Sequence, residues 1–580
     1  MIKAFLEEKT PLIIIFSLYV ITFILTYGHC GDLIVDCGRE AYIPYAISQN
    51  KVLYKDIFCI YGAFPYLFNT FFYKIFSANL CILYTIGAIF GLLYVLGVYF
   101  CSREFLSKSI SVCISSLVIF AVIFENSMFN FIFPYSYAMV FSCVFAIWIL
   151  YFLIKFIHTK NKNYMHASAF LWGAICVSKI DFVPVIVPIL IVFLMFEDNK
   201  LKEIPKLFAY GLIIPFLTYF ILFSQGLTFT DITNNSNYIE LMTKTKAFEY
   251  FYAKYSIVSF NVSHFIQNIK TLLYNAFATL LFFTALLFAA RRRKKAVKYI
   301  LIAGICILYY SALFLQDTLP QTYFALLPYI CTLFLLFELW NYFKIKDYKN
   351  KSRCIRLLLL IFALICSLKN FHSLLLSFYG AYSFAPLFIC LILFISDLLE
   401  DNFLYNTQKQ YKSALCAFII ILTLLFANIL FIWVREENSK VKTPFGTIKA
   451  EKMTAEPFNE TLRYLKNHSN LDDSLLVIPE GIILNFLSNR TWDFYQTSFT
   501  PLDFETFGED VIIKNITEIK PKYIALSNRN TSEYAKSYVC KDYGVKACKY
   551  IVENYTLEAA FGEKFRIYLF KYRDDEEDFK

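Results

Sequence analysis

Three carboxylates lie close together just after the first long apolar segment of the chain. Asp32, Asp36 and Glu40 fall within the run 31–42. Asp36 and Glu40 are four residues apart, so they share one face if this run is helical. A carboxylate beside an apolar interface loses hydration, which raises its pKa towards that of a general base for an acceptor hydroxyl or amine. The same residues also fit a solvated loop, or a surface pair of Arg39 with Glu40 that contributes at most about 1 kcal/mol.

The composition indicates which elements position these acids. The chain has 580 residues, of which 58% are hydrophobic and 17% charged, and its mean hydropathy is +0.53. Soluble chains usually carry about 25% charged residues. These values exclude a soluble multidomain protein, a disordered chain, a collagen-like repeat and a small disulfide scaffold. The net charge of +10 does not indicate nucleic-acid binding, because the basic clusters lie in short loops between apolar blocks. The sequence predicts a polytopic α-helical membrane protein.

The apolar blocks are long enough to be membrane spans, which need about 20 residues each. Residues 1–10 are followed by no cleavage pattern, so the first block is predicted to be a retained span. The two short blocks around Lys179 and Asp181 could instead form one bent or re-entrant hairpin. About 13 spans are predicted, at 11–28, 80–100, 108–124, 136–156, 166–178, 182–196, 207–225, 271–290, 299–316, 322–340, 356–369, 379–398 and 413–434.

The distribution of Lys and Arg predicts a cytoplasmic N-terminus. The basic stretches 291–295 and 344–356 then lie inside, whereas the segment 125–135, which has no Lys or Arg, lies outside. Two long loops, 29–79 and 226–270, also lie outside. Within the first of them, the aromatic segments 61–76 and 41–49 are too short to span. They are predicted to be helices lying in the membrane interface.

Charged residues and turns return at Arg435, so a separate α/β domain is predicted for residues 435–580, outside the membrane, as a lid or docking domain. Its strands are expected at 475–478, 523–526 and 565–570, and its helices at 458–467, 482–487 and 511–519. The domain has no phosphate-binding loop and no metal motif.

The 16 cysteines and six histidines do not predict a metal held by His and Cys ligands. Most cysteines lie within apolar spans, where Cys acts as a small buried hydrophobe. Cys540 and Cys548 could pair in an oxidising compartment, although their spacing alone is not diagnostic.

A family resemblance rests on the run Asp36-Cys37-Gly38-Arg39-Glu40-x-Tyr42, together with 54–58, Tyr61-Gly62 and Ile75-Phe76. These residues resemble the first outside loop of C-type (GT-C) glycosyltransferases. Such enzymes have many spans and take a sugar from a polyprenyl-phosphate carrier; protein mannosyltransferases and aminoarabinose transferases are among them. The tail segments 476–481 and 485–490 are similar to those of uncharacterised bacterial members. The resemblance implies a catalytic membrane domain over 1–434 and a bacterial inner or plasma membrane.

The resemblance implies that Asp36 is the base of a single displacement with inversion at the anomeric carbon. Family members often have two adjacent acids at this position, whereas Cys37 follows Asp36 here. Glu40 and Asp32 therefore remain alternative bases. Glu125 and Asp56 are candidates for a second acid, and Glu125 also fits an ordinary interfacial acid. A divalent metal between Asp36 and another acid is left open.

The departing lipid phosphate implies a cationic partner at membrane depth. Lys179 is the first candidate, because a charge at the membrane centre costs about 2.5–3.5 kcal/mol and so needs a reason. A Lys179–Asp181 pair at an outer turn fits equally. Lys55 and Arg490 are further candidates. Gln321-Thr322-Tyr323 resembles the entry to the carrier cavity in family members, or is an interfacial anchor.

The resemblance thus predicts a glycosyltransferase whose partners are a polyprenyl-phosphate-linked sugar, membrane lipid and a glycan, lipid or protein acceptor, with no nucleic acid. A transporter or flippase of a lipid-linked sugar is the alternative. It would require helices broken by Gly or Pro in matching positions of the two halves. Pro184, Pro188 and Pro215 have no obvious counterparts in the second half. A glycan polymerase or ligase would carry its large loop between spans.

Overall fold

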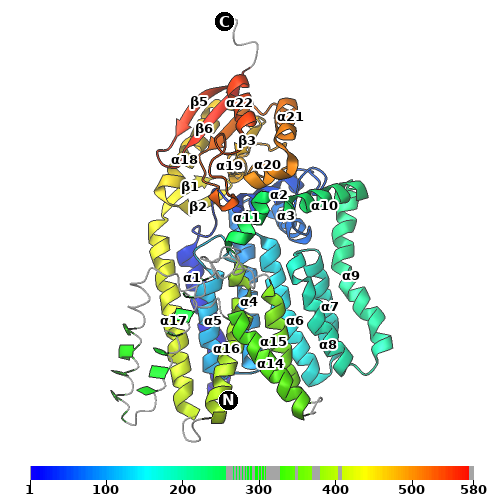
Figure 1. Cartoon of the computed structure of the whole chain (residues 1–580), viewed down its shortest axis with the longest axis vertical. Coiled ribbons are helices and arrows are strands. Elements are labelled where there is room, and N and C mark those ends of the chain that lie inside the picture. Colours follow the sequence, from blue (N-terminus) through cyan, green and yellow to red (C-terminus); the bar gives the residue numbers. More distant parts are fainter. Residues whose placement is uncertain are drawn as a thin grey trace.

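The computed structural model describes residues 2–255, 327–345, 350–368, 379–402 and 408–573, together with scattered positions between 266 and 308. These residues form a bundle of long helices, with an α/β unit at the end of the bundle opposite the N-terminus (Figure 1). The predicted spans 271–290 and 299–316 and the segment 321–323 lie largely or wholly outside the described residues.

The remaining predicted spans each overlap a helix of the bundle. Within the described part of the chain, five helices are long and apolar enough to cross a membrane, at Lys9–Thr26, Leu80–Arg103, Tyr137–Thr159, Lys200–Ser224 and Lys412–Glu436. The chain is therefore a membrane protein, as its composition predicts. The bundle helices are α1 (Ile2–Thr26), α4 (Leu80–Arg103), α5 (Lys108–Val118), α6 (Tyr137–Thr159), α7 (Lys162–Cys176), α8 (Ile186–Phe196), α9 (Lys200–Ser224), α14 (Leu327–Ile345), α15 (Lys351–Cys366), α16 (Ala381–Asn402) and α17 (Gln408–Glu436).

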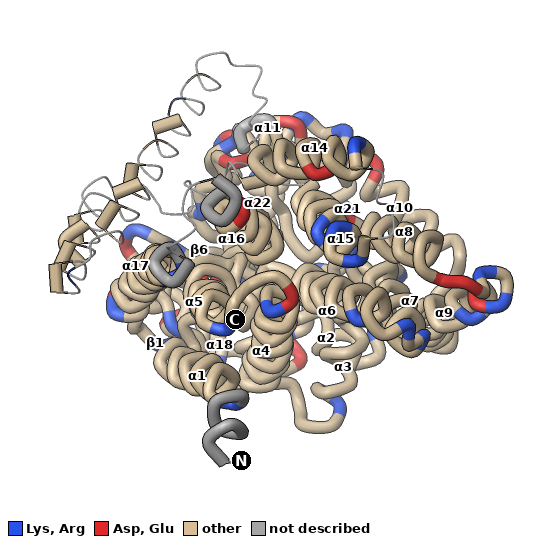
Figure 2. The backbone as a smooth tube through the Cα atoms, turned by 90° about the horizontal axis from the view of Figure 1, so that it is seen from below, with Lys and Arg blue, Asp and Glu red and all other residues tan. Residues whose placement is uncertain are grey.

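Basic residues mark the end of the bundle that lies farthest from the α/β unit. Figure 2 shows Lys and Arg in the loops beside α7 and α9 and near α15 on this face. In this region the buried Glu203 carboxylate accepts from Lys162 Nζ at 2.9 Å and from Lys206 Nζ at 3.0 Å. The charges at this end thus tie α7 to α9.

Between the bundle and the α/β unit lie α2 (Cys37–Ser48), α3 (Phe64–Phe76), α10 (Phe229–Thr243) and α11 (Lys246–Tyr255) (Figure 1). Helix α3 has one exposed apolar face containing Phe71 and Phe76, as expected of an interfacial helix. The interfacial prediction for 41–49 is wrong, because α2 is buried over most of its length. Its small residues let the α/β unit pack directly onto it.

The α/β unit follows α17 through a hairpin of β1 (Ser439–Thr443) and β2 (Gly446–Ala450) and helix α18 (Lys452–His468). A four-stranded sheet has the order β3-β4-β6-β5, in which β3 and β4 are parallel and β6 is antiparallel to both β4 and β5. The strands expected at 475–478, 523–526 and 565–570 are found as β3 (Leu475–Ile478), β4 (Tyr523–Ser527) and β6 (Ile567–Tyr572). The expected helices lie in α18, α19 (Ile483–Ser488) and α21 (Glu509–Ile519). The prediction missed β1, β2 and β5 (Tyr555–Phe561).

Gly38 lets α2 approach α19 closely. A Cβ at this position would lie 2.5 Å from the Ile483 backbone nitrogen. Nearby, the Tyr42 hydroxyl accepts from the Trp492 N–H at 2.7 Å, and the Tyr45 hydroxyl donates to Asn489 at 2.6 Å. These contacts hold the α/β unit against the segment that carries Asp36.

Gly38→Ala is therefore expected to destabilise the protein by about 1–3 kcal/mol, the usual cost of forcing an extra group into a packed site. Thermal unfolding in detergent and limited proteolysis between α17 and β1 measure the effect. Gly211→Ala is a matched helical control, because its Cβ would approach nothing closer than 3.6 Å. Equal melting temperatures for the two variants would contradict the packing argument.

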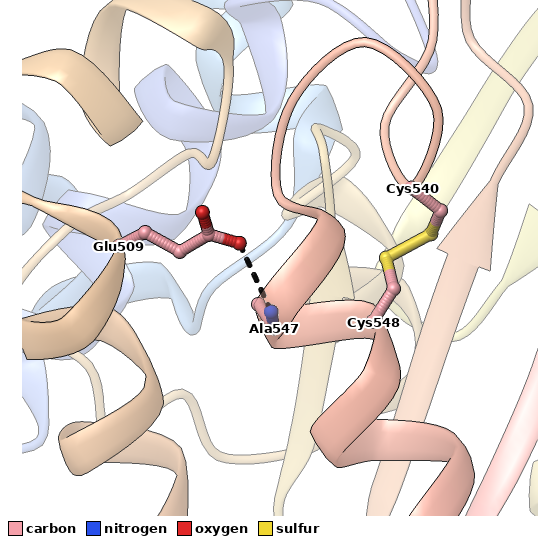
Figure 3. The surroundings of a disulfide bond; sticks show 4 residues. All are labelled: Glu509, Cys540, Ala547 and Cys548. Carbon is pink, nitrogen blue, oxygen red and sulfur yellow. Dashed lines mark hydrogen bonds between the residues drawn. A yellow bond between two sulfur atoms is a disulfide. The ribbon is translucent and has the colours of Figure 1, made fainter.

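Cys540 and Cys548 form a disulfide, which confirms the pairing considered from the sequence. The bond ties the segment before helix α22 (Val545–Asn554) to the first turns of that helix (Figure 3). Glu509 of α21 accepts from the Ala547 N–H at 3.0 Å, which anchors the same turn.

Replacing both cysteines with Ala is expected to destabilise the α/β unit by about 2.5 kcal/mol, from the loop-closure entropy of a cross-link eight residues apart. The melting temperature under non-reducing conditions measures this loss. Cys81→Ala, at an exposed free cysteine, should leave the melting temperature unchanged. A double variant as stable as the parent would show that the cross-link adds nothing.

Candidate functional site

Asp36 ends the loop after α1 and immediately precedes helix α2. Its φ of 47° lies in the left-handed region, which non-glycine residues rarely occupy. The turn before it is closed by Asp32, whose Oδ1 accepts from the N–H groups of Ile34 at 2.6 Å and Val35 at 2.8 Å. Arg39, one turn along α2, pairs with Asp36 Oδ1 at 2.9 Å, and the Asp36 side chain keeps 29% exposure. The backbone therefore fixes Asp36 while leaving part of its carboxylate accessible.

Asp32 has a second role in the same turn, since it lines a cavity of about 150 Å³ with Trp433 and Glu437. Burial raises the pKa of Asp32, opposed by its two backbone hydrogen bonds. Burial also raises the pKa of Glu437 to about 7. The cavity lies where the α1–α2 loop meets the end of α17.

Glu40 is buried completely, and both of its oxygens are engaged. Oε1 accepts from the Tyr66 hydroxyl of α3 at 2.7 Å, and Oε2 accepts from the Tyr137 N–H at the start of α6 at 2.8 Å. Burial raises the pKa of Glu40, while Arg39 and these two donors lower it. The Arg39–Glu40 contact of 3.5 Å is thus a buried one and not the surface pair considered from the sequence. Glu40 joins α2 to α3 and α6.

Lys179 is brought to Tyr61 by a backbone contact between distant segments. The Gly62 N–H donates to the Ser178 oxygen at 2.9 Å, and the Phe64 N–H donates to the Val177 oxygen at 3.0 Å. This pairing places the Tyr61 ring 3.8 Å from Lys179 Nζ. Arg39 Cζ lies 5.1 Å from the centroid of the same ring. Tyr61 therefore connects the cation beside Asp36 to the buried Lys179.

The expected Lys179–Asp181 pair is also present, at 3.7 Å. The turn between α7 and α8 contains the short 3₁₀ helix Ile180–Val185. Within the segment 166–196, this turn joins helices α7 and α8.

Aromatic residues that the sequence prediction left unassigned surround this pair of cations. The Tyr135 ring lies 6.4 Å from Tyr61, 5.7 Å from Tyr379 and 6.0 Å from Tyr382. Its backbone oxygen accepts from Arg39 Nη2 at 2.9 Å. We call Tyr61, Tyr135, Tyr379 and Tyr382 the tyrosine cluster.

The other predicted site residues make their contacts elsewhere. Lys55 is exposed and donates to the Gly226 oxygen at 3.2 Å, and the exposed Asp56 accepts from the Val52 N–H at 2.7 Å. Glu125 is buried and accepts from the backbone and side chain of Ser127. Arg490 is buried within the α/β unit, where it donates to Ser469 and to backbone oxygens.

The α/β unit adds charged residues near Asp36. Arg529 pairs with Glu480 at 2.7 Å and with Glu533 at 2.6 Å. The charge of Asp36 contributes to the raised pKa of both Glu480 and the neighbouring Tyr534, after the larger effect of burial. These residues therefore border the Asp36 side of the site.

The raised pKa of Glu480 predicts that the stability of the protein depends on pH. Burial raises the pKa of Glu480 from 4.5 to about 8; the charge of Arg529 opposes this shift, and the charges of nearby carboxylates add to it. The folded chain then binds more protons than the unfolded chain between these two values, so stability falls as pH rises through that window. Glu480→Gln is expected to flatten the fall in melting temperature between pH 5 and pH 8. Glu460→Gln, at an exposed position, is the control. Parallel profiles for parent and Glu480→Gln would contradict the assignment.

Among the residues that the structure describes, no group of three or more His, Cys, Asp or Glu side chains is arranged to hold a metal ion. The central acid of the site, Asp36, pairs with the Arg39 guanidinium at 2.9 Å.

Residues 63–223 match the dolichyl-phosphate-mannose-protein mannosyltransferase family. The match confirms, over this part of the chain, the resemblance to polyprenyl-phosphate-dependent glycosyltransferases. It includes Lys179, whereas Asp36, Tyr61, Gly62 and the α/β unit lie outside it.

A comparison with curated proteins finds no match. Among solved structures, the chain is similar to the oligosaccharyltransferase AglB from Archaeoglobus fulgidus, with 12% identity, a TM-score of 0.48, and coverage of 99% of this chain and 75% of that chain. It is also similar to ArnT from Cupriavidus metallidurans. The apo form has 10% identity, a TM-score of 0.46 and coverage of 96% and 97% of the two chains. The form bound to undecaprenyl phosphate has 10% identity, a TM-score of 0.45 and coverage of 98% and 99%.

Proposed function

We propose that the protein is a membrane glycosyltransferase that moves a sugar from a polyprenyl-phosphate carrier to an acceptor. The observation that carries this proposal is the link from Asp36 through Arg39 and Tyr61 to Lys179. It joins a partly exposed carboxylate to a buried cation at the end of the bundle that faces the α/β unit. The match of residues 63–223 to a mannosyltransferase family supports the same reaction class.

The proposed reaction is a single displacement with inversion. Asp36 accepts the proton of the acceptor hydroxyl or amine as that group attacks the anomeric carbon. The bond from this carbon to the lipid phosphate breaks, and its electron pair leaves with the phosphate. Lys179 stabilises the departing negative charge. Arg39 orients Asp36, and Glu40 fixes α2 against α3 and α6.

The proposed orientation places the N-terminus in the cytoplasm and the site outside. The basic loops beside α7, α9 and α15 follow the positive-inside rule. The Cys540–Cys548 disulfide supports an oxidising compartment for the α/β unit.

The test is transfer of radiolabel from a panel of polyprenyl-phosphate-linked sugars by the purified protein in detergent, with membrane extract as acceptor. Transfer of label to a non-lipid or lipid acceptor, dependent on the protein, is the expected result. Binding of a donor without transfer to any acceptor would overturn the proposal and favour a flippase.

A further inference from the structure

Two hydroxyl groups of the tyrosine cluster are buried without a partner. Tyr135 and Tyr382 are each about 2% exposed, and neither hydroxyl has a hydrogen-bond partner among the residues that the structure describes. Two other buried tyrosines near Glu40 do have partners, since Tyr66 donates to Glu40 and Tyr137 donates to the Leu83 oxygen. A buried unpaired polar group costs about 1–3 kcal/mol, so a ligand that pairs with it regains that energy.

The Tyr135 ring lies beside Lys179, and the Tyr382 ring packs against Tyr135. The Tyr135 ring centroid is 5.9 Å from Lys179 Nζ and 6.0 Å from the Tyr382 ring. Arg39 fixes the Tyr135 backbone through its oxygen. On the other side, Phe129 packs against Tyr135 at 5.0 Å and Phe131 against Tyr382 at 5.6 Å. The two hydroxyls thus belong to a rigid aromatic wall next to the cation assigned to the phosphate.

The chemistry of this wall suits a sugar better than a phosphate. Aromatic rings pack against the apolar faces of a pyranose, while a neutral hydroxyl both donates to and accepts from sugar hydroxyls. A phosphate instead calls for the cations already present at Lys179 and Arg39. The geometry points to Tyr135 and Tyr382 as the residues that bind the sugar of the lipid-linked donor. This inference rests on the proposed function and assigns its sugar subsite.

The test compares donor binding by Tyr135→Phe and Tyr382→Phe with that of the parent protein. The probes are polyprenyl-phosphate-linked mannose, glucose, galactose and arabinose, with sugar-free polyprenyl phosphate as the second arm. Each variant is expected to bind the preferred sugar-bearing donor about 5- to 100-fold more weakly, because a sugar hydroxyl loses its partner. Affinity for the sugar-free phosphate should not change.

Stability provides an independent readout. Because each hydroxyl is unpaired in the folded protein, its removal should leave the melting temperature unchanged or raise it. Weaker donor binding by either single variant therefore cannot be attributed to a loss of stability. Tyr555→Phe is the matched control, since the Tyr555 hydroxyl is also buried and unpaired but lies on β5 of the α/β unit. It should bind both probes like the parent.

Two outcomes would overturn the inference while leaving the proposed function intact. Equal weakening of both probes would assign the hydroxyls to the phosphate, and unchanged binding of both would leave them without a ligand. Absence of sugar transfer by the parent protein, by contrast, would overturn the proposed function itself.

Discussion

Replacing Asp36 with Asn is expected to slow sugar transfer by about 10²–10⁴-fold, the usual contribution of a positioned general base. The amide keeps the shape of the side chain but cannot take the acceptor's proton. Its oxygen can still accept from Arg39, whose contact with Asp36 is a single one at 2.9 Å. The melting temperature should therefore stay close to that of the parent, and binding of the sugar-free carrier should be unchanged.

The Glu40→Gln variant tests whether Glu40 is itself the base or only positions Asp36. Both oxygens of Glu40 accept from donors, so the new amide NH₂ must face either the Tyr66 hydroxyl or the Tyr137 N–H. Transfer and melting temperature should therefore fall together. Asp472→Asn, at an exposed acid of the α/β unit, should change neither. Full activity in Asp36→Asn, with transfer lost in a Glu40→Gln protein of unchanged stability, would make Glu40 the base.

Hydropathy and the family resemblance predicted much of the helical bundle and the positions of its charged residues. The described helices of the bundle could be predicted from apolar length, and Asp36 and Lys179 stand out because charged residues next to apolar blocks are costly. The strands at 475–478 and 523–526 are buried apolar runs and were found as β3 and β4. Strand β5 was missed because it is largely exposed and carries Glu558, so it lacks a buried face to mark it.

The assembly of the site could not be predicted, because it depends on contacts between distant segments. Tyr61 meets Lys179 only through the pairing of Gly62 with Ser178. Tyr135 lies in the loop before α6, and Tyr382 lies on α16. Nothing in an aromatic-rich sequence distinguishes these two residues from aromatic residues that face lipid. Helix α2 was placed in the interface by its apolar content. Its burial depends on the close approach of Ile483 to Gly38, which no local pattern predicts.

Replacing Lys179 with Met is expected to weaken binding of the lipid phosphate by about 10- to 100-fold, since a charge-assisted hydrogen bond contributes about 1.5–3 kcal/mol. Met keeps most of the apolar stem of Lys but lacks Nζ, so the charge and its contact with the Tyr61 ring are both removed. Lys179→Arg should retain part of the affinity, because it keeps the charge beside the ring. Equilibrium binding of sugar-free polyprenyl phosphate to the purified parent, Lys179→Met and Lys179→Arg proteins measures these affinities.

Lys55→Met is the matched control and also tests the competing assignment. Lys55 is exposed and contacts the Gly226 oxygen, so its removal should change carrier binding less than about 3-fold, the effect of a solvent-screened charge. The burial of Lys179 gives a second way to distinguish it from Lys55, because salt screens exposed charges far more than buried ones. The defect of Lys179→Met should therefore persist between 0.1 M and 1 M salt. If carrier binding is weakened in Lys55→Met and not in Lys179→Met, the phosphate site lies at the surface of the 29–79 loop. If the weakened binding of Lys179→Met is no longer seen at high salt, the Lys179 cation is solvent-exposed and not buried.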